Sequence, residues 1–191
     1  MRLAKILTLA CLLVLAAASL ALAGATYDRV MKDKVVRIGL MTDSIPAGFY
    51  NEKKEWVGFD VDIAEEVGKR LGVKVERVAV NNKTRIAFVQ EGRIDLSVAN
   101  MTHKRERDKS IDFSITYFFD GQKVMVKKGS AKTWKDLVGK KVATMQGTTS
   151  EINLRNQLKK EGDKNADQNV ISFQKEDRKS TRLNSSHGYI S

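Results

Sequence analysis

The stretch from Asp95 to Tyr117 decides the fold, and it reads Asp-Leu-Ser-Val-Ala-Asn-Met-Thr-His-Lys-Arg-Glu-Arg-Asp-Lys-Ser-Ile-Asp-Phe-Ser-Ile-Thr-Tyr. Its first part, from Leu96 to Ala99, is a short apolar run that predicts a buried strand. A polar segment with amide, hydroxyl and guanidinium groups follows. Because ligands bind at the carboxyl ends of strands in open parallel sheets, this change in polarity predicts a ligand-binding loop.

Two side chains in this loop suit an anion. The Arg107 guanidinium and the Thr102 hydroxyl can together hold a carboxylate through charge-assisted hydrogen bonds. The run of charged residues from Lys104 to Lys109 suits an ordinary solvated loop equally well. The spacing alone leaves both interpretations open.

The first residues have the pattern of a secretory signal peptide. Arg2 and Lys5 precede an apolar run from Ile6 to Leu22, and small residues end it at Ala23. This order predicts export and cleavage after Ala23 rather than an uncleaved membrane anchor. We therefore assign residues 1–23 to a signal peptide.

The residue types needed for common catalytic sites are missing from the mature sequence. The only cysteine, Cys11, lies inside the apolar run, so we expect no disulfide and no thiol nucleophile. The sequence also contains no Ser/His/Asp set and no metal-ligand cluster. We interpret His103 as a solvated loop residue. We therefore expect a protein that is not an enzyme, with no catalytic residue, no metal and no cofactor.

The C-terminal segment differs in character from the rest. The sequence from Asp177 to His187 resembles the translation of a widely used sequencing adapter. We therefore expect residues 177–191 to be an artefactual, disordered tail, with the natural sequence interrupted near Glu176.

The charge distribution bears on the class of partner. The formal net charge is +11, of which Arg2 and Lys5 contribute +2 and the segment from Asp177 a net +2, which leaves +7 for residues 24–176. This excess favours anionic solutes, but acidic and basic residues alternate along the chain. Because the sequence has no concentrated basic face with interleaved aromatic residues, we expect no nucleic-acid partner.

The expected elements alternate in type. Residues 35–40, 73–80 and 96–99 predict strands, and residues 58–72 and 84–91 predict helices. This alternation implies a parallel sheet with helical crossovers. A second α/β unit follows, with strands over 120–128, 141–145 and 169–173, one helical turn over 133–137 and a helix over 152–160 that Ser150 can cap.

The helix over 58–72 has a clear pattern. Ile63, Val67 and Leu71 recur every fourth position and, with Ala64 beside them, predict its apolar stripe. We interpret its acidic residues as helix caps and a solvated face rather than as a metal site or catalytic pair; they are Asp60, Asp62, Glu65 and Glu66.

A second polar strand end lies at Gly147–Ser150. Its hydroxyl and backbone N–H groups stand at a predicted helix N-terminus, where an anion can bind. Ordinary helix capping explains the same residues about as well.

An ordered set of motifs resembles the family 3 extracellular solute-binding proteins, which are the periplasmic receptors of amino-acid ABC importers. The motifs cover roughly residues 35–173 and are Gly58–Ile63, Arg85–Ile86, Ala99–Thr102, Arg105–Arg107, Ile111–Ser114, Asp120–Lys123, Asp136–Lys140 and Gly147–Glu151.

This resemblance implies an α/β fold of the periplasmic-binding-protein type II, in which two lobes joined by a hinge close on an amino acid. Lobe 1 would span residues 24–124, and an incomplete lobe 2 would span residues 125–176. Arg107 would hold the ligand α-carboxylate, assisted by Thr102 and the Asn100 backbone. Thr148 and Thr149 would contact the ligand from lobe 2.

The resemblance also bears on ligand preference. Arg85 matches a position that holds the side-chain carboxylate in the glutamate/aspartate branch, although a solvated helix residue is an open alternative. Met41 stands where that branch carries an arginine, and Ala47 where many members carry an aromatic residue. The match at Arg85 favours glutamate, aspartate or another polar amino acid, whereas the departures at Met41 and Ala47 leave the choice of ligand open.

The implied role is that of a periplasmic monomer that delivers an amino acid to an ABC permease in the inner membrane. Two alternatives are a ligand-binding module of a larger sensor or glycan-cleaving protein, and a periplasmic dehydratase of the same fold.

Overall fold

The computed structural model describes residues 24–174 and 187–190. The predicted signal peptide, residues 1–23, and most of the predicted tail, residues 177–186 and 191, lie outside these ranges. A helix over residues 24–33 precedes the first strand. Within the described ranges, none of the helices combines the length and the apolar character that a bilayer span requires.

The first unit contains a parallel sheet, as predicted. β1 (Val35–Leu40) lies between β5 (Lys74–Ala79) and β6 (Leu96–Ser97), and both of its neighbours run parallel to it. The helices α2 (Phe59–Leu71) and α3 (Thr84–Gln90) lie between consecutive parallel strands in the chain. The loop after β6 therefore leaves the carboxyl edge of this sheet, where ligands bind in folds of this kind.

The core of this unit forms between β1 and α2. Buried Val36, Ile38 and Leu40 of β1 pack with the face of α2 that carries Val61 and Ala64. The predicted stripe is confirmed in part, because Ala64 is buried and both Ile63 and Val67 pack, partly buried, against this core. The buried face also includes Val61 and Gly68, which the prediction left out. The helix turns its smaller side chains to the sheet, and this lets it approach β1 closely.

A small antiparallel sheet fixes the start of α2. It consists of β2 (Asp43–Ser44), β3 (Gly48–Tyr50) and β4 (Trp56–Val57). Gly58 follows with φ of 130°, and a Cβ atom there would collide with the Ala47 carbonyl oxygen. Only glycine adopts this conformation without strain.

The second unit has its own core. Its elements are β7 (Val124–Lys127), the 3₁₀ helix η1 (Trp134–Leu137), β8 (Val142–Met145), α5 (Thr149–Lys160), α6 (Ala166–Asn169) and β9 (Val170–Phe173). β8 and β9 pair in parallel, and α5 packs on them. The buried apolar residues are Leu137, Leu154, Leu158, Ala166 and Val170.

The last described strand corrects one expectation. β10 (His187–Ile190) pairs with β7 in antiparallel register, from His187 opposite Lys127 to Ile190 opposite Val124. The prediction of a wholly disordered tail is therefore wrong for these four residues. A strand edge presents backbone N–H and C=O groups that another extended segment can pair with, and β10 pairs with β7 in this way.

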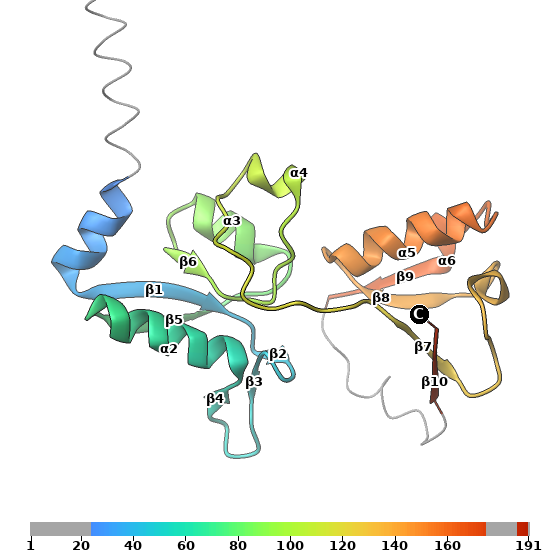
Figure 1. The fold of residues 1–191 in the computed structure, drawn as a ribbon, viewed down its shortest axis with the longest axis horizontal. Helices are drawn as coiled ribbons and strands as arrows, with labels where there is room; N and C mark the ends of the chain where they lie inside the picture. The colour runs from blue at the N-terminus through green and yellow to red at the C-terminus, as the bar shows by residue number, and fades with distance from the viewer. Residues whose placement is uncertain (1–23, 175–186, 191) are drawn as a thin grey trace, which may run out of the picture.

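The two units lie side by side and are connected by the extended segment 112–123, which follows the short helix α4 (Arg105–Asp108) (Figure 1). This arrangement places the loop after β6 and the N-terminus of α5 close to each other. The residues between these two elements form the candidate site.

Candidate functional site

A cavity of about 290 Å³ lies between the two units. All six residues singled out in the sequence line it: Arg85, Asn100, Thr102, Arg107, Thr148 and Thr149. The structure thus brings together side chains that are up to 64 positions apart in the chain. Further lining residues include Met41, Ser44, Asn82, Asp120 and Gln122.

Arg85 is a buried side chain, so its interpretation as a solvated helix residue is wrong. It is 2% exposed, and its Nη1 donates to the carbonyl oxygens of Ala99 at 2.6 Å and Asn100 at 3.1 Å. Its Nε has no hydrogen-bond partner in the described part of the chain. Burial, followed by the nearby charge of Arg107, lowers the pKa of Arg85 to about 10. The guanidinium therefore remains cationic at neutral pH and holds the end of the β6 strand.

Arg107 connects the two units. Its Nη1 donates to the Thr102 carbonyl oxygen at 2.6 Å, and its Nη2 lies 3.4 Å from the Gly147 carbonyl oxygen across the cavity. Burial lowers the pKa of Arg107, while the neighbouring Glu106 opposes this shift. The interpretation as a solvated loop fits Arg105, which is exposed, but not Arg107.

Asn100 has an unusual backbone conformation at the end of the β6 segment. Its φ of 47° lies in the left-handed region, which asparagine tolerates better than most residues. Its carbonyl oxygen faces Arg85, and it lines the cavity together with Thr102. Asn100 therefore lies at the cavity, and a role of its backbone in ligand binding stays a prediction.

Thr148 and Thr149 have different roles at the start of α5. The Thr148 hydroxyl donates to the Met145 carbonyl oxygen at 2.7 Å and accepts from the Glu151 backbone N–H at 3.2 Å. Thr148, not Ser150, therefore caps the helix. The Thr149 hydroxyl instead lies 3.4 Å from the Thr102 hydroxyl, across the cavity.

Glu151 fixes the loop that precedes α5. Its carboxylate accepts from the Gly147 backbone N–H at 2.9 Å, the Ser172 hydroxyl at 2.6 Å and Arg155 Nη2 at 3.2 Å. Burial raises the pKa of Glu151, but these three donors together hold it below the ordinary value. Glu151 thereby positions the Gly147 carbonyl that faces Arg107.

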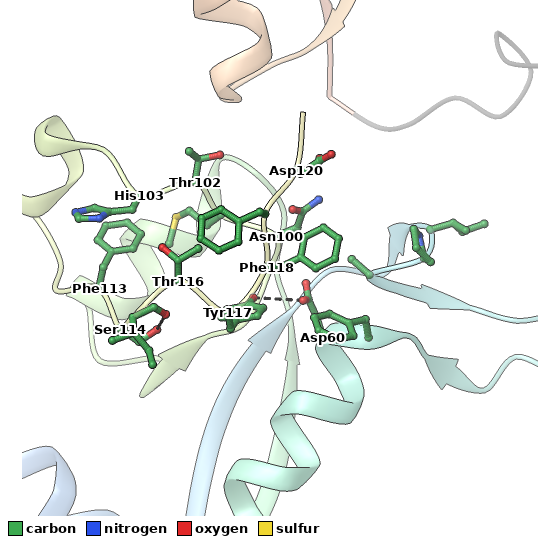
Figure 2. Close-up of a pocket in the computed structure, with 17 residues that line it drawn as sticks. Asp60, Asn100, Thr102, His103, Phe113, Ser114, Thr116, Tyr117, Phe118 and Asp120 are labelled. Carbon is green, nitrogen blue, oxygen red and sulfur yellow. Dashed lines mark hydrogen bonds between the residues drawn. The ribbon is translucent and has the colours of Figure 1, made fainter. Parts of the chain in front are cut away.

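A larger cavity of about 790 Å³ adjoins the first one and shares Asn100, Thr102 and Asp120 with it (Figure 2). Several aromatic residues line it, with Phe113, Tyr117 and Phe118 among them. The sequence did not predict this cavity, because the pattern of an extended segment does not show whether its apolar side chains are buried or partly exposed.

Asp60 lies beside this larger cavity and corrects another expectation. It is 2% exposed, and the Tyr117 hydroxyl donates to its Oδ1 at 3.3 Å (Figure 2). Burial raises the pKa of Asp60, although the Asn100 backbone and Tyr117 oppose the shift. The interpretation of Asp60 as part of a solvated acidic face is therefore wrong.

His103 lies on the rim of the larger cavity and away from the smaller one. Its Nε2 is 2.6 Å from Asp108 Oδ1, and its ring stacks on Phe113 with centroids 4.7 Å apart. The described residues contain no group of three or more His, Cys, Asp or Glu side chains arranged to hold a metal ion. The smaller cavity thus offers guanidinium, hydroxyl and amide groups, which suit the binding of a small anionic or zwitterionic molecule.

The fold and the sequence define the class of protein. Residues 36–185 match the bacterial extracellular solute-binding proteins, family 3, and the chain belongs to this family. It is 35% identical over 138 residues to a glutamate/aspartate import solute-binding protein of Salmonella typhimurium. It is 38% identical over 162 residues to the ABC transporter glutamine-binding protein of Bacillus subtilis.

These matches cover 68% and 82% of this chain but only 46% and 56% of the two relatives. The chain thus spans about half the length of the curated relatives it matches.

Solved structures support the same fold. An ancestral arginine-binding protein bound to arginine aligns with a TM-score of 0.69 and 39% identity, and the match covers 78% of this chain and 65% of that chain. The ancestral amino acid-binding protein AncCDT-1, a precursor of cyclohexadienyl dehydratase, aligns with a TM-score of 0.71 and 29% identity, over 85% of this chain and 72% of that chain. The protein therefore has the type II periplasmic-binding-protein fold that the sequence predicts.

Proposed function

We propose that this protein binds an amino acid in the smaller cavity, outside the cytoplasm, for delivery to an ABC permease. The observation that carries the proposal is that Arg85 and Arg107 of the first unit meet Thr148 and Thr149 of the second unit at one small cavity. The relatives are named as binding proteins for glutamate/aspartate, glutamine or arginine, and this supports an amino acid as the ligand class.

In the proposed mode, lobe 1 (residues 24–124) and lobe 2 (residues 125–176) close on the ligand. Arg107 holds the α-carboxylate, and Thr149 donates to the ligand from the opposite side. A ligand that touches both lobes favours the closed state, because it binds that state more tightly than the open one.

Arg85 supports an acidic or otherwise polar amino acid. It is a second cation at the same cavity, and its buried Nε is a donor without a partner among the described residues. A side-chain carboxylate or amide oxygen of the ligand would satisfy such a donor. Asp120 is the single carboxylate that lines this cavity and is available for the ligand ammonium group.

We propose a binding protein rather than an enzyme. Among the described residues that line the smaller cavity there is no histidine to serve as general base and no cysteine to serve as nucleophile. We further propose that residues 1–23 direct export of the protein and that it acts as a monomer in the periplasm.

A binding experiment on the full chain tests this function. A thermal-shift screen against the twenty amino acids should reveal stabilising ligands, with glutamate and aspartate among them. Calorimetry should then show that Arg107→Ala weakens binding by roughly 2–5 kcal/mol, since it leaves a buried carboxylate unpaired. Arg105→Ala removes the same charge from an exposed neighbour on α4 and should leave affinity unchanged. Unchanged affinity in Arg107→Ala, or no binding of any amino acid, would contradict the proposal.

A further inference from the structure

A line of polar side chains runs from the surface of α5 to the smaller cavity. Asn153 Nδ2 donates to Gln122 Oε1 at 2.8 Å, and Gln122 Nε2 donates to Thr149 Oγ1 at 2.8 Å. Thr149 Oγ1 in turn lies 3.4 Å from Thr102 Oγ1. Asn153 is exposed and does not line the cavity, whereas Thr149 is 7% exposed and does.

The chemistry of these groups gives the line a direction. An amide has a donor end and an acceptor end, so Asn153 acting as donor leaves Gln122 its own NH₂ group to direct at Thr149. A hydroxyl that accepts a hydrogen bond from Gln122 keeps its own hydrogen for another acceptor. For Thr149 that acceptor is either the Thr102 hydroxyl, at a long 3.4 Å, or a ligand.

We infer that Asn153 and Gln122 are positioning residues that orient the Thr149 hydroxyl hydrogen into the cavity, where it donates to an anionic oxygen of the ligand. The inference rests on the proposed function, and it names the group that lobe 2 recognises. A reversed line would present a lone pair of Thr149 instead and would disfavour a carboxylate at this point.

The alternative direction is chemically possible, because each amide can rotate by half a turn. In the reversed line Gln122 Nε2 donates to Asn153 Oδ1, and Thr149 donates to Gln122 Oε1. Aspartate at position 153 accepts hydrogen bonds but does not donate them at neutral pH. We therefore expect Asn153→Asp to reverse the direction of the hydrogen bonds, so that Gln122 donates to residue 153 and accepts from Thr149.

Asn156→Asp is a matched control. Asn156 is an exposed residue on the same helix, so the substitution adds the same charge without touching the line. Since the line contributes about one net hydrogen bond to the ligand, Asn153→Asp should weaken binding of the best amino-acid ligand about three- to tenfold. Asn156→Asp should leave affinity within about twofold. The loss in Asn153→Asp should persist in 0.5 M salt, whereas simple charge repulsion would be screened.

A second measurement decides the direction without any ligand. In the NMR spectrum of the full chain, the Gln122 side-chain NH₂ protons should show nuclear Overhauser effects to the Thr149 methyl group. In Asn153→Asp these effects should disappear and effects to the β protons of residue 153 should replace them. If the wild-type NH₂ protons are close to Asn153 instead, the inference is overturned.

The two measurements separate the two proposals. The predicted NMR pattern in a chain that binds no amino acid would overturn the proposed function and keep the direction of the line. Amino-acid binding with equal losses in Asn153→Asp and Asn156→Asp would keep the proposed function and overturn the inference.

Discussion

Replacing Glu151 with glutamine tests how the loop before α5 is held in place. In the folded protein the Glu151 carboxylate accepts three hydrogen bonds, from Gly147, Ser172 and Arg155. A glutamine oxygen can retain the bond from the Gly147 N–H, and the Ser172 hydroxyl can turn to accept from the new NH₂ group. The Arg155 guanidinium, which only donates, loses its Glu151 acceptor and keeps only its other acceptors, among them the Asp167 and Val170 carbonyl oxygens.

The solvent exposure of the Glu151–Arg155 pair determines how much the substitution lowers the free energy of unfolding. The side chains of Glu151 and Arg155 are 17% and 24% exposed, so water screens them only in part. Hydrogen bonds to charged groups contribute about 1.5–3 kcal/mol when shielded, and exposed i,i+4 pairs about 0.3–0.5 kcal/mol. We therefore expect Glu151→Gln to lower the free energy of unfolding by about 1–2 kcal/mol at pH 7.

Urea denaturation at several pH values is the assay, with Glu66→Gln as control. Glu66 forms an i,i+4 pair with Arg70 on α2, but its side chain is 45% exposed, so its replacement should change stability little. Because the pKa of Glu151 is lowered in the folded state, its contribution is present above the unfolded pKa and is lost as pH falls through the folded pKa. The wild type and Glu151→Gln should thus converge in acid. Equal effects of the two substitutions at pH 7, or a difference that does not shrink in acid, would refute this reasoning.

Three other substitutions probe the scaffold by urea denaturation. Gly58→Ala forces a Cβ into the Ala47 carbonyl at φ of 130° and should cost at least about 2 kcal/mol; a neutral result would contradict the tight turn. Asp95→Asn removes the partner of Arg37 at 2.7 Å and should cost about 2–4 kcal/mol at pH 7, less in acid, because burial raises the Asp95 pKa but the hydrogen bonds of Arg37 and Arg29 outweigh it. A cost that is independent of pH would argue against the ion pair. Leu158→Ala empties part of the second core and should cost about 2–5 kcal/mol, whereas exposed Ile152→Ala should be nearly neutral.

Local sequence patterns were sufficient to predict the parallel sheet. β1 and its crossover helices follow from apolar runs, helix periodicity and terminal glycines, which act over a few residues. Gly72 shows this, because it ends α2 in the left-handed conformation that a C-terminal glycine supplies. The burial of Val61 and Gly68 on the same face was not predictable, since it depends on how closely the helix approaches the sheet.

Long-range contacts decided the features that the sequence could not reveal. Asp60 and Asp62 look alike in the helix pattern, but Tyr117, 57 positions later, contacts only Asp60. Arg105 and Arg107 are likewise equivalent by composition, and the Gly147 carbonyl, 40 positions away, distinguishes Arg107. The resemblance to a known family identified the six lining residues as candidates. Only the structure showed how deeply they are buried and which groups they contact.

The acceptors that Arg85 and Arg107 use are all main-chain carbonyl oxygens, those of Ala99, Asn100, Thr102 and Gly147. A carbonyl oxygen belongs to every amino acid, so mutation at these four positions does not delete the acceptor. The hydrogen bonds that the two arginines donate therefore do not depend on the side chains at these four positions. Substitutions that preserve the backbone conformation at these positions would therefore leave the two arginines in place while they change the side chains around the cavity.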